Sequence, residues 1–269
     1  GCIDTLETEI EQPTELELQL ISTIDNPCNG EEKGEIDIFV KGSVKPYTYD
    51  WSNGAQTQDI TSLPAGEYRV KVTGATGCEK SLSTVIKEPP PLELSIVSTE
   101  DIKCSGGNNG IIDLSVKGGV KPYHFSWSNG AETEDLSDLV AGSYTVSVVD
   151  IQGCSKEISA HIKQPEPLVA SFADVKNINC HGDSTGAISI DVKGGTLPYN
   201  FKWSNGAVTE DISNLTVGKY SVVITDAMGC SQNLSASVTQ PDPLIADIVS
   251  VQDVLCKDQK TGNIDISVK

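Results

Sequence analysis

The chain has few of the residues on which catalysis, metal binding or nucleic-acid binding depend. Only three histidines occur among 269 residues, and aromatic residues make up 5% of the chain. Basic residues number 19 against 38 acidic ones, which gives a net charge of −19. This acidity argues against nucleic acid as a partner, because its phosphates require a basic surface. It keeps an exposed protein soluble instead.

Long apolar runs and catalytic motifs are also lacking. No stretch is apolar for the length that a transmembrane helix needs, and no segment resembles a signal peptide. The motifs G-x-S-x-G, H-E-x-x-H and the P-loop do not occur. We therefore expect no enzyme activity, no catalytic residues, no cofactor and no membrane insertion.

What the chain does have is eight cysteines at regular spacing. The gaps between them alternate between 26 and 50 residues, so two cysteines recur with a 76-residue period. Even, regular cysteines indicate disulfides formed in an oxidising compartment, whereas zinc sites need clustered cysteines or nearby histidines. We expect disulfides and no metal for Cys2, Cys28, Cys78, Cys104, Cys154, Cys180, Cys230 and Cys256.

The same 76-residue period holds in the rest of the sequence. The motif Trp-Ser-Asn-Gly begins at Trp51 and returns at Trp127 and Trp203, and such internal self-similarity is the mark of a repeat protein. The period predicts three complete repeats, at 13–88, 89–164 and 165–240. Residues 1–12 would be the C-terminal strand of a preceding repeat and 241–269 the N-terminal part of a further one, so we expect the chain to be a piece of a longer protein.

Within a repeat the pattern predicts six or seven short strands. In the second repeat apolar residues alternate with polar ones over 92–96, 112–116, 123–127 and 144–148, as in half-buried strands. Asn129-Gly130 predicts a hairpin turn. The fold class is therefore all-β: a tandem array of small immunoglobulin-like or PKD-like β-sandwiches. With proline-stiffened linkers, the array would form an extended rod that gains about 35–40 Å per repeat.

The recurring aromatic residues offer the sharpest candidate for a binding site. Three tryptophans, one in each complete repeat, could stack on a polysaccharide. However, Tyr47, Tyr49 and Trp51 point to one face of their strand while polar residues occupy the other, so the alternation favours a core position. We expect Trp51, Trp127 and Trp203 in the core, with glycan binding as the alternative.

Two further recurring sets are expected to hold turns. Tyr68, Tyr144 and Tyr220 each follow a Leu-x-x-Gly-x segment, as in the tyrosine corner of β-sandwiches. Asp59, Asp135 and Asp211 recur singly, without the D-x-D-x-D loops that bind calcium, which favours a solvated or turn-capping role over calcium binding.

Three regular disulfide schemes are compatible with the spacing. Pairs within a repeat would be Cys28–Cys78, Cys104–Cys154 and Cys180–Cys230. Pairs across a junction would be Cys2–Cys28, Cys78–Cys104, Cys154–Cys180 and Cys230–Cys256. Pairs reaching the next repeat would be Cys28–Cys154 and Cys104–Cys230. Loop-closure entropies of roughly 3.5–4.9 kcal/mol differ too little to decide.

The number of strands between the Trp strand and the Tyr144 strand would decide. One strand puts both cysteines of a repeat at the same end and allows pairs within repeats, whereas two strands put them at opposite ends. A straight rod favours the second case. The stretch 131–139 is too short for two full strands, so the preferred pairing is within repeats.

The repeat resembles the SprB repeat of Bacteroidota surface proteins. The residues that carry the resemblance are Cys-x5-Gly, then Pro-Tyr-x-aromatic-x-Trp-Ser-Asn-Gly, then Ala/Val-Gly-x-Tyr and a closing Gly-Cys followed by Gln/Glu-Pro. The pattern covers essentially the whole chain. Ser43 where Gly119 and Gly195 occur, and Gly74 in place of Asp150 and Asp226, are slight departures.

The resemblance implies export by the type IX secretion system to the cell surface. It implies a non-catalytic stalk segment of a large adhesin filament attached to the outer membrane, with roles in gliding motility and surface attachment. Its partners would be neighbouring repeats and, through other regions of the protein, the gliding and secretion machinery. The alternatives are a polysaccharide-binding array and a spacer in another type IX-secreted surface protein.

Overall fold

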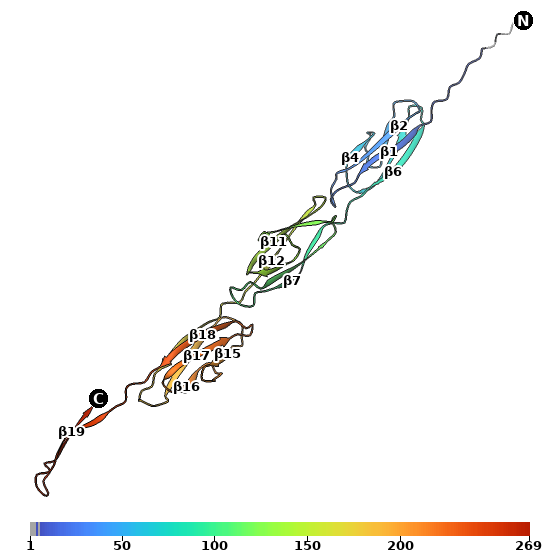
Figure 1. Cartoon of the computed structure of the whole chain (residues 1–269). Coiled ribbons are helices and arrows are strands. Elements are labelled where there is room, and N and C mark those ends of the chain that lie inside the picture. The colour runs from blue at the N-terminus through green and yellow to red at the C-terminus, as the bar shows by residue number, and fades with distance from the viewer. Residues whose placement is uncertain (1–3, 5) are drawn as a thin grey trace. The chain divides into compact units, whose positions relative to one another are not determined.

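The computed structural model describes residues 4 and 6–269, and every regular element among them is a β-strand (Figure 1). Accordingly, no helix in this part of the chain could cross a membrane. The first repeat contains β1 (Glu17–Ile24), β2 (Gly34–Lys41), β3 (Thr48–Trp51), β4 (Ile60–Leu63), β5 (Gly66–Thr73) and β6 (Glu79–Ile86). The second contains β7 (Glu93–Glu100), β8 (Gly110–Lys117), β9 (Tyr123–Trp127), β10 (Leu136–Leu139), β11 (Gly142–Asp150) and β12 (Ser155–Ile162). The third contains β13 (Val169–Lys176), β14 (Gly186–Lys193), β15 (Asn200–Trp203), β16 (Ile212–Leu215), β17 (Gly218–Thr225) and β18 (Ser231–Val238).

The chain divides into two compact units. One unit consists of residues up to 99 with 111–137 and 143–161, and the other consists of 100–110, 138–142 and 162–269. Both units take residues from the second repeat. The domain boundaries inferred from the 76-residue period therefore stay a prediction.

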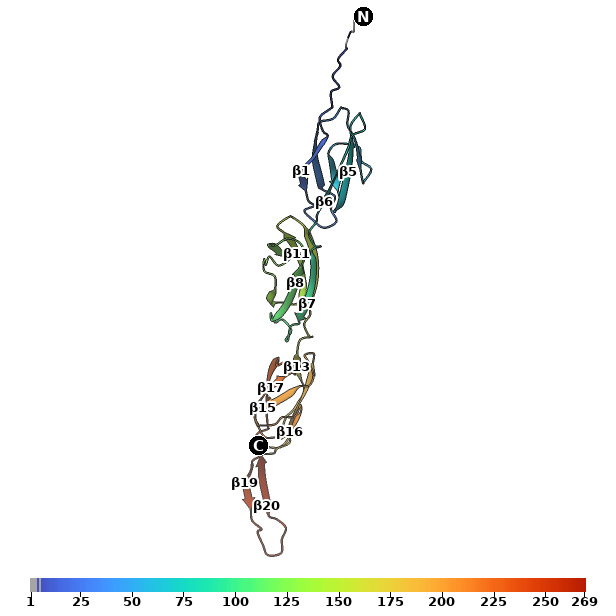
Figure 2. The same ribbon diagram turned by 90° about the vertical axis from the view of Figure 1, so that its right-hand side faces the viewer.

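The first repeat consists of two three-stranded sheets, in the orders β1-β2-β4 and β3-β5-β6. In Figure 2, β1 and β5 represent these two sheets. The same orders return as β13-β14-β16 and β15-β17-β18, and as β7-β8-β10 and β9-β11-β12. They match the A-B-E and C-F-G strands of an immunoglobulin domain without its D strand. Each complete repeat is thus a small immunoglobulin-like sandwich, as predicted.

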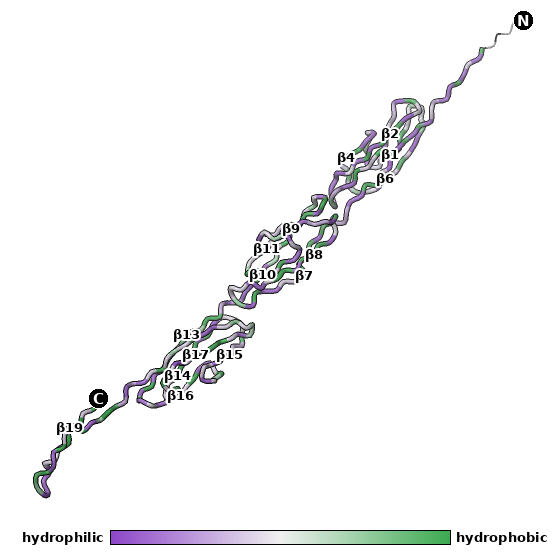
Figure 3. Tube along the Cα trace, in the orientation of Figure 1, coloured by the Kyte–Doolittle hydropathy of each residue, from purple (hydrophilic) through white to green (hydrophobic). Residues whose placement is uncertain are grey.

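Strict alternation of apolar residues builds the core between the two sheets. Hydropathy alternates along the strands (Figure 3), and β2 alternates buried with exposed residues over its whole length. Ile36 and Ile38 of one sheet and Val70 and Val72 of the other are at most 1% exposed. Their burial against one another holds each sandwich together.

The predicted hairpin at Asn53-Gly54 and its equivalents is wrong. The residues form a tight turn, in which the Gly54 N–H donates to the Trp51 carbonyl at 2.8 Å. The chain then leaves the sheet: β3 pairs with β5, whereas β4 pairs with β2 in the other sheet. Two short strands in different sheets therefore follow each other where a hairpin within one sheet was expected.

These two strands run in the same direction. β1 and β6 end side by side, because the Asn26 N–H donates to the Lys87 carbonyl at 2.9 Å. β2 is antiparallel to β1 and to β4, and β5 is antiparallel to β6 and to β3. β3 and β4 must therefore run the same way, and the chain does not reverse between them.

The two ends of the described chain lie outside the three sandwiches. Residues 1–12 were predicted to be the C-terminal strand of a preceding repeat, and the described residues 6–12 form no strand. In the 76-residue register they correspond to residues 82–88, which include part of β6. At the other end β19 (Ala246–Gln252) and β20 (Asn263–Val268) form a two-stranded ribbon (Figure 2) whose Ile248 is 66% exposed.

Close packing at the first residue of β2 leads to a test of the sandwich. A Cβ atom on Gly34 would lie 2.6 Å from Ile86 Cγ2 and 2.8 Å from the Leu63 carbonyl oxygen. We expect Gly34→Ala to lower the free energy of unfolding by about 1–3 kcal/mol, as overpacking does. Gly66→Ala is the matched control, because its nearest neighbour would be 4.0 Å away. Urea unfolding of both variants measures the difference, and equal midpoints would contradict the packing at Gly34.

Candidate functional site

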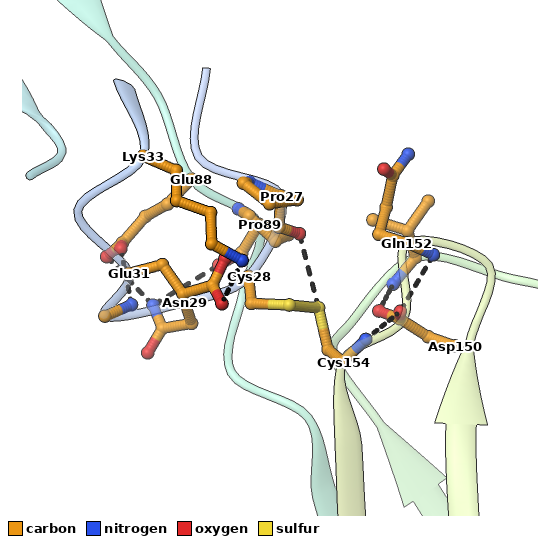
Figure 4. The surroundings of a disulfide bond; sticks show 12 residues. Pro27, Cys28, Asn29, Glu31, Lys33, Glu88, Pro89, Asp150, Gln152 and Cys154 are labelled. Atoms are coloured by element: carbon orange, nitrogen blue, oxygen red, sulfur yellow. Dashed lines mark hydrogen bonds and ion pairs between the residues drawn. A yellow bond between two sulfur atoms is a disulfide. The ribbon is translucent and has the colours of Figure 1, made fainter. Parts of the chain in front are cut away.

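Disulfide bonds join consecutive repeats. Cys28 lies in the loop after β1 and Cys154 directly precedes β12; their Sγ atoms are 2.06 Å apart, with 126 residues of separation (Figure 4). Cys104 and Cys230 form the equivalent bond, with the same separation and the same Cα–Cα distance of 5.6 Å. Of the three schemes compatible with the spacing, the structure has the one that reaches the next repeat.

The preferred pairing within repeats, Cys28–Cys78, Cys104–Cys154 and Cys180–Cys230, is therefore wrong. Cys78 precedes β6, whereas Cys28 lies in the loop beside its other end, because Asn26 is hydrogen-bonded to Lys87. Eight residues of strand span about 26 Å, and a disulfide needs Cα atoms within about 7 Å. One strand, β4, does lie between β3 and β5, as expected. However, β4 runs in the same direction as β3, so it does not bring the two cysteines to the same end.

The loop that carries the first cysteine is fixed by the residue before the linker prolines. Glu88 accepts the Asn29 side-chain amide at 2.9 Å and the Gly30 N–H at 2.7 Å (Figure 4). Gln164 and Gln240 accept the equivalent glycine N–H groups at 2.8 and 3.0 Å. The end of one repeat's last strand thus positions the cysteine that bonds to the next repeat.

A buried carboxylate shapes the turn that carries the second cysteine. Asp150 is 2% exposed and accepts the N–H groups of Gln152, Cys154 and Val120, each at 2.9 Å. Asp226 accepts the corresponding three in the third repeat. Three charge-assisted bonds satisfy a carboxylate that burial would otherwise destabilise.

The first repeat replaces this carboxylate by a coordinated exchange. A Cβ on Gly119 would lie 2.8 Å from the Asp150 carboxylate, so glycine leaves the space that this carboxylate occupies. In the first repeat Ser43 and Gly74 stand at these positions, and a Cβ on Gly74 would lie 2.7 Å from Ser43 Oγ. The two departures noted in the sequence are therefore one compensated change.

Three cysteines of the described chain are free and exposed: Cys78, Cys180 and Cys256. Cys2 lies outside the described residues. The partner of Cys78, in the register of the two observed bonds, would lie 126 residues before it, and that of Cys180 would lie 126 residues after it. Neither position falls within residues 1–269. Hydrogen bonds with the Thr76 and Ser43 hydroxyls lower the pKa of the Cys78 thiol.

The recurring tryptophans do not form a binding surface. Trp51, Trp127 and Trp203 are 2–3% exposed, and each indole N–H donates to a threonine carbonyl at 2.9 Å. The core position predicted for them is confirmed. A ring with both faces covered cannot stack on a sugar, so burial removes the feature on which the glycan alternative depended.

The tyrosine corner predicted for one recurring set is also found. The hydroxyls of Tyr68 and Tyr220 donate to carbonyls four residues earlier, at 2.9 and 3.0 Å. The recurring aspartates, in contrast, do not cap their own turns. The Asp59 carboxylate accepts the N–H of Ile38 in β2 at 3.0 Å, and the same bond to a strand 21 residues earlier recurs at Asp135 and Asp211.

Sequence reasoning missed two sets of polar residues that hold the loops on either side of the disulfides. Asp150 and Asp226 stand in the Asp-x-x-Gly-Cys turn, and Glu88 stands before the prolines. Both sets recur in register, apart from Gly74 and the Glu/Gln exchange. A search for polar residues at fixed offsets from each cysteine would have found them.

Comparison with known proteins agrees with the repeat pattern. The SprB repeat model matches residues 21–56, 96–132 and 173–208. Each of the three repeats therefore contains a segment that matches the SprB repeat. Each match ends two residues after the Trp-Ser-Asn-Gly motif. No curated protein gave a significant match.

Solved structures of tandem immunoglobulin and other extracellular domains resemble this chain distantly. Sidekick-1 immunoglobulin domains 1–5 share 13% identity at a TM-score of 0.34, covering 83% of this chain and 58% of that one. Drosophila OTK extracellular domains 3–5 share 11% identity at 0.30, covering 84% and 97%. The protocadherin GammaB4 extracellular domain shares 11% at 0.37, covering 91% and 52%. This chain thus spans little more than half of the length of two of these structures.

The buried carboxylate of the third repeat predicts sensitivity to acid. Burial raises the pKa of Asp226, but the backbone N–H groups bonded to it outweigh burial, so its pKa lies below the ordinary value of 3.8. A lowered folded-state pKa stabilises the fold above that ordinary value, and the stabilisation is lost as the pH falls through the folded-state pKa. We expect Asp226→Asn to cost about 1–3 kcal/mol at pH 7, and its deficit relative to the unaltered chain to shrink below pH 3.8. Urea unfolding across pH measures this.

The control for this experiment is Asp174→Asn, at an exposed carboxylate of the same repeat. We expect its stability to follow that of the unaltered chain at every pH. A deficit of Asp226→Asn that stays constant from pH 7 to pH 3 would contradict the assigned role of the charge.

The lowered pKa of Cys78 predicts a reactive thiol. In a chain with Cys2→Ser, Cys180→Ser and Cys256→Ser, we expect Thr76→Val with Ser43→Ala to slow alkylation of Cys78 several-fold at neutral pH. The reason is that less of the thiol is then ionised, and the thiolate is the nucleophile. The pH profile of iodoacetamide labelling should move to higher pH, while Ser81→Ala should leave it in place. An unmoved profile in the double variant would show that the hydroxyls do not act on Cys78.

Proposed function

We propose that this chain is a stalk segment of a large, secreted cell-surface adhesin filament that serves surface attachment and gliding motility and has no catalytic role. The observation that carries the proposal is the covalent bond between consecutive SprB repeats at both junctions where both partner cysteines are present. A chain of small sandwiches linked in this way suits transmission of force over distance better than recognition of a ligand.

The compartment follows from the same bonds. Disulfides persist in oxidising surroundings outside the cytosol, and disulfide-linked SprB repeats fit an extracellular, secreted protein. The finer proposal is export by the type IX secretion system and attachment to the outer membrane. The neighbouring repeats are the direct partners of each repeat, and contacts with the gliding and secretion machinery are assigned to other regions of the protein.

Acidity and small size support a stalk role. A net charge of −19 keeps neighbouring filaments apart and soluble. Each repeat is so short that its core supplies limited stability. A cross-link that closes a loop of 126 residues adds about 5 kcal/mol in the chain-entropy model, which is comparable to the stability of a small domain.

Antibody fragments raised against the purified chain test this function. We expect them to label intact cells that produce the protein and, at saturation, to reduce attachment to glass and gliding speed several-fold. Fragments against an unrelated surface protein are the control. Labelling without any effect on attachment or gliding would contradict the adhesin and favour a spacer in another surface protein. Labelling only after lysis would contradict the surface location.

A further inference from the structure

The two cysteine gaps correspond to two structurally different segments. The 26-residue gap from Cys78 to Cys104 contains β6, a proline-rich linker and β7, and that from Cys154 to Cys180 contains β12, a linker and β13. The 50-residue gap from Cys28 to Cys78 contains β2 to β5, which fold back and forth through both sheets. The short segments pass once from one repeat into the next, whereas the long segments contain most of each sandwich.

The disulfides connect short segments to short segments. Cys28–Cys154 joins the end of segment 2–28 to the start of segment 154–180. Cys104–Cys230 joins the end of segment 78–104 to the start of segment 230–256. Each covalent path therefore passes from one short segment to another and omits every 50-residue segment.

We propose that the short segments and the disulfides between them carry tension along the chain, and that the 50-residue segments lie off the load path. This inference rests on the proposed role as a stalk. It assigns a function to the cysteine spacing itself: the 26-residue segments form two staggered covalent lines, one through Cys28–Cys154 and one through Cys104–Cys230.

The short segments are suited to bearing tension because their strands are already nearly fully extended. A β-strand already rises about 3.3 Å per residue, and a fully extended chain reaches about 3.3–3.6 Å. Segment 154–180 contains two eight-residue strands, joined by residues 163–168 and followed by the loop 177–180, so tension lengthens its strands very little. A 50-residue segment, in contrast, would release up to about 170 Å of chain if it were pulled straight.

The long segments are thereby relieved of load. They carry the buried tryptophans and the strands β5 and β17 with the corner tyrosines. If tension passed along the backbone alone, it would pull directly on these strands, and the rate of forced unfolding would decide how long the stalk holds. With the disulfides in place, the sandwich cores need only stay folded.

Single-molecule stretching between two chosen residues tests the load path. Handles are attached by click chemistry to Glu11→p-azidophenylalanine and Asp183→p-azidophenylalanine, in a chain with Cys2→Ser, Cys78→Ser, Cys180→Ser and Cys256→Ser. Through Cys28–Cys154 the handles are connected by about 46 residues of backbone, whereas the backbone alone has 172 residues between them. We expect the oxidised molecule to stop at about 160 Å and the reduced one to reach about 600 Å, a nearly fourfold difference.

Two matched variants locate the bond that carries the load. With Cys28→Ser and Cys154→Ser, only Cys104–Cys230 shortens the path, to about 140 residues, and we expect extension to about 490 Å. With Cys104→Ser and Cys230→Ser the limit should stay at about 160 Å. Near-ultraviolet circular dichroism checks that each variant keeps its tryptophans packed.

Two outcomes would overturn the load path. One is an oxidised molecule that extends past about 490 Å, and the other is a limit of about 160 Å that survives Cys28→Ser with Cys154→Ser. The measurement uses the purified chain alone. It can fail while the antibody experiment succeeds, or succeed while that experiment fails, so it is separable from the proposed adhesin function.

Discussion

In space, the two cysteines of a repeat lie at opposite ends of one eight-residue strand, and the disulfide connectivity depends on that distance. Because β6 holds Cys78 at one end and lies beside the Cys28 loop at the other, neither cysteine can bond within its own repeat. Cys28 bonds instead to Cys154 of the next repeat, and Cys78 is free. The hydrogen bonds of Glu88 and the carboxylate of Asp150 then fix the two sides of that contact.

The residues around the disulfides vary between repeats, whereas the bonded cysteines do not. The turn around the second cysteine exists in two chemical forms, glycine with a buried aspartate or serine with a glycine, because Gly119 with Asp150 and Ser43 with Gly74 fill the same space. The cysteines and their 126-residue separation do not vary between the two observed bonds. Local packing can thus be exchanged in pairs, whereas the spacing and geometry of the bonded cysteines stay the same.

Much of the fold could be predicted from the sequence, because it depends on local alternation. The strands, the buried Trp51 and the corner Tyr68 follow from side chains that alternate or recur. The disulfide pairing could not be predicted, since it depends on strand direction. β3 and β4 count as two strands in sequence but run one way in space, because the chain changes sheets after Asn53-Gly54. A turn signal shows that the chain turns, and not into which sheet it continues.

The two disulfide loops overlap, since residues 104–154 belong to both. A protease that cuts the backbone once, anywhere between Cys28 and Cys230, therefore leaves two fragments that are still covalently joined. A cut before Cys154 is bridged by Cys28–Cys154, and a cut after it is bridged by Cys104–Cys230. A chain exposed to proteases would therefore stay continuous after a single cut in an exposed loop.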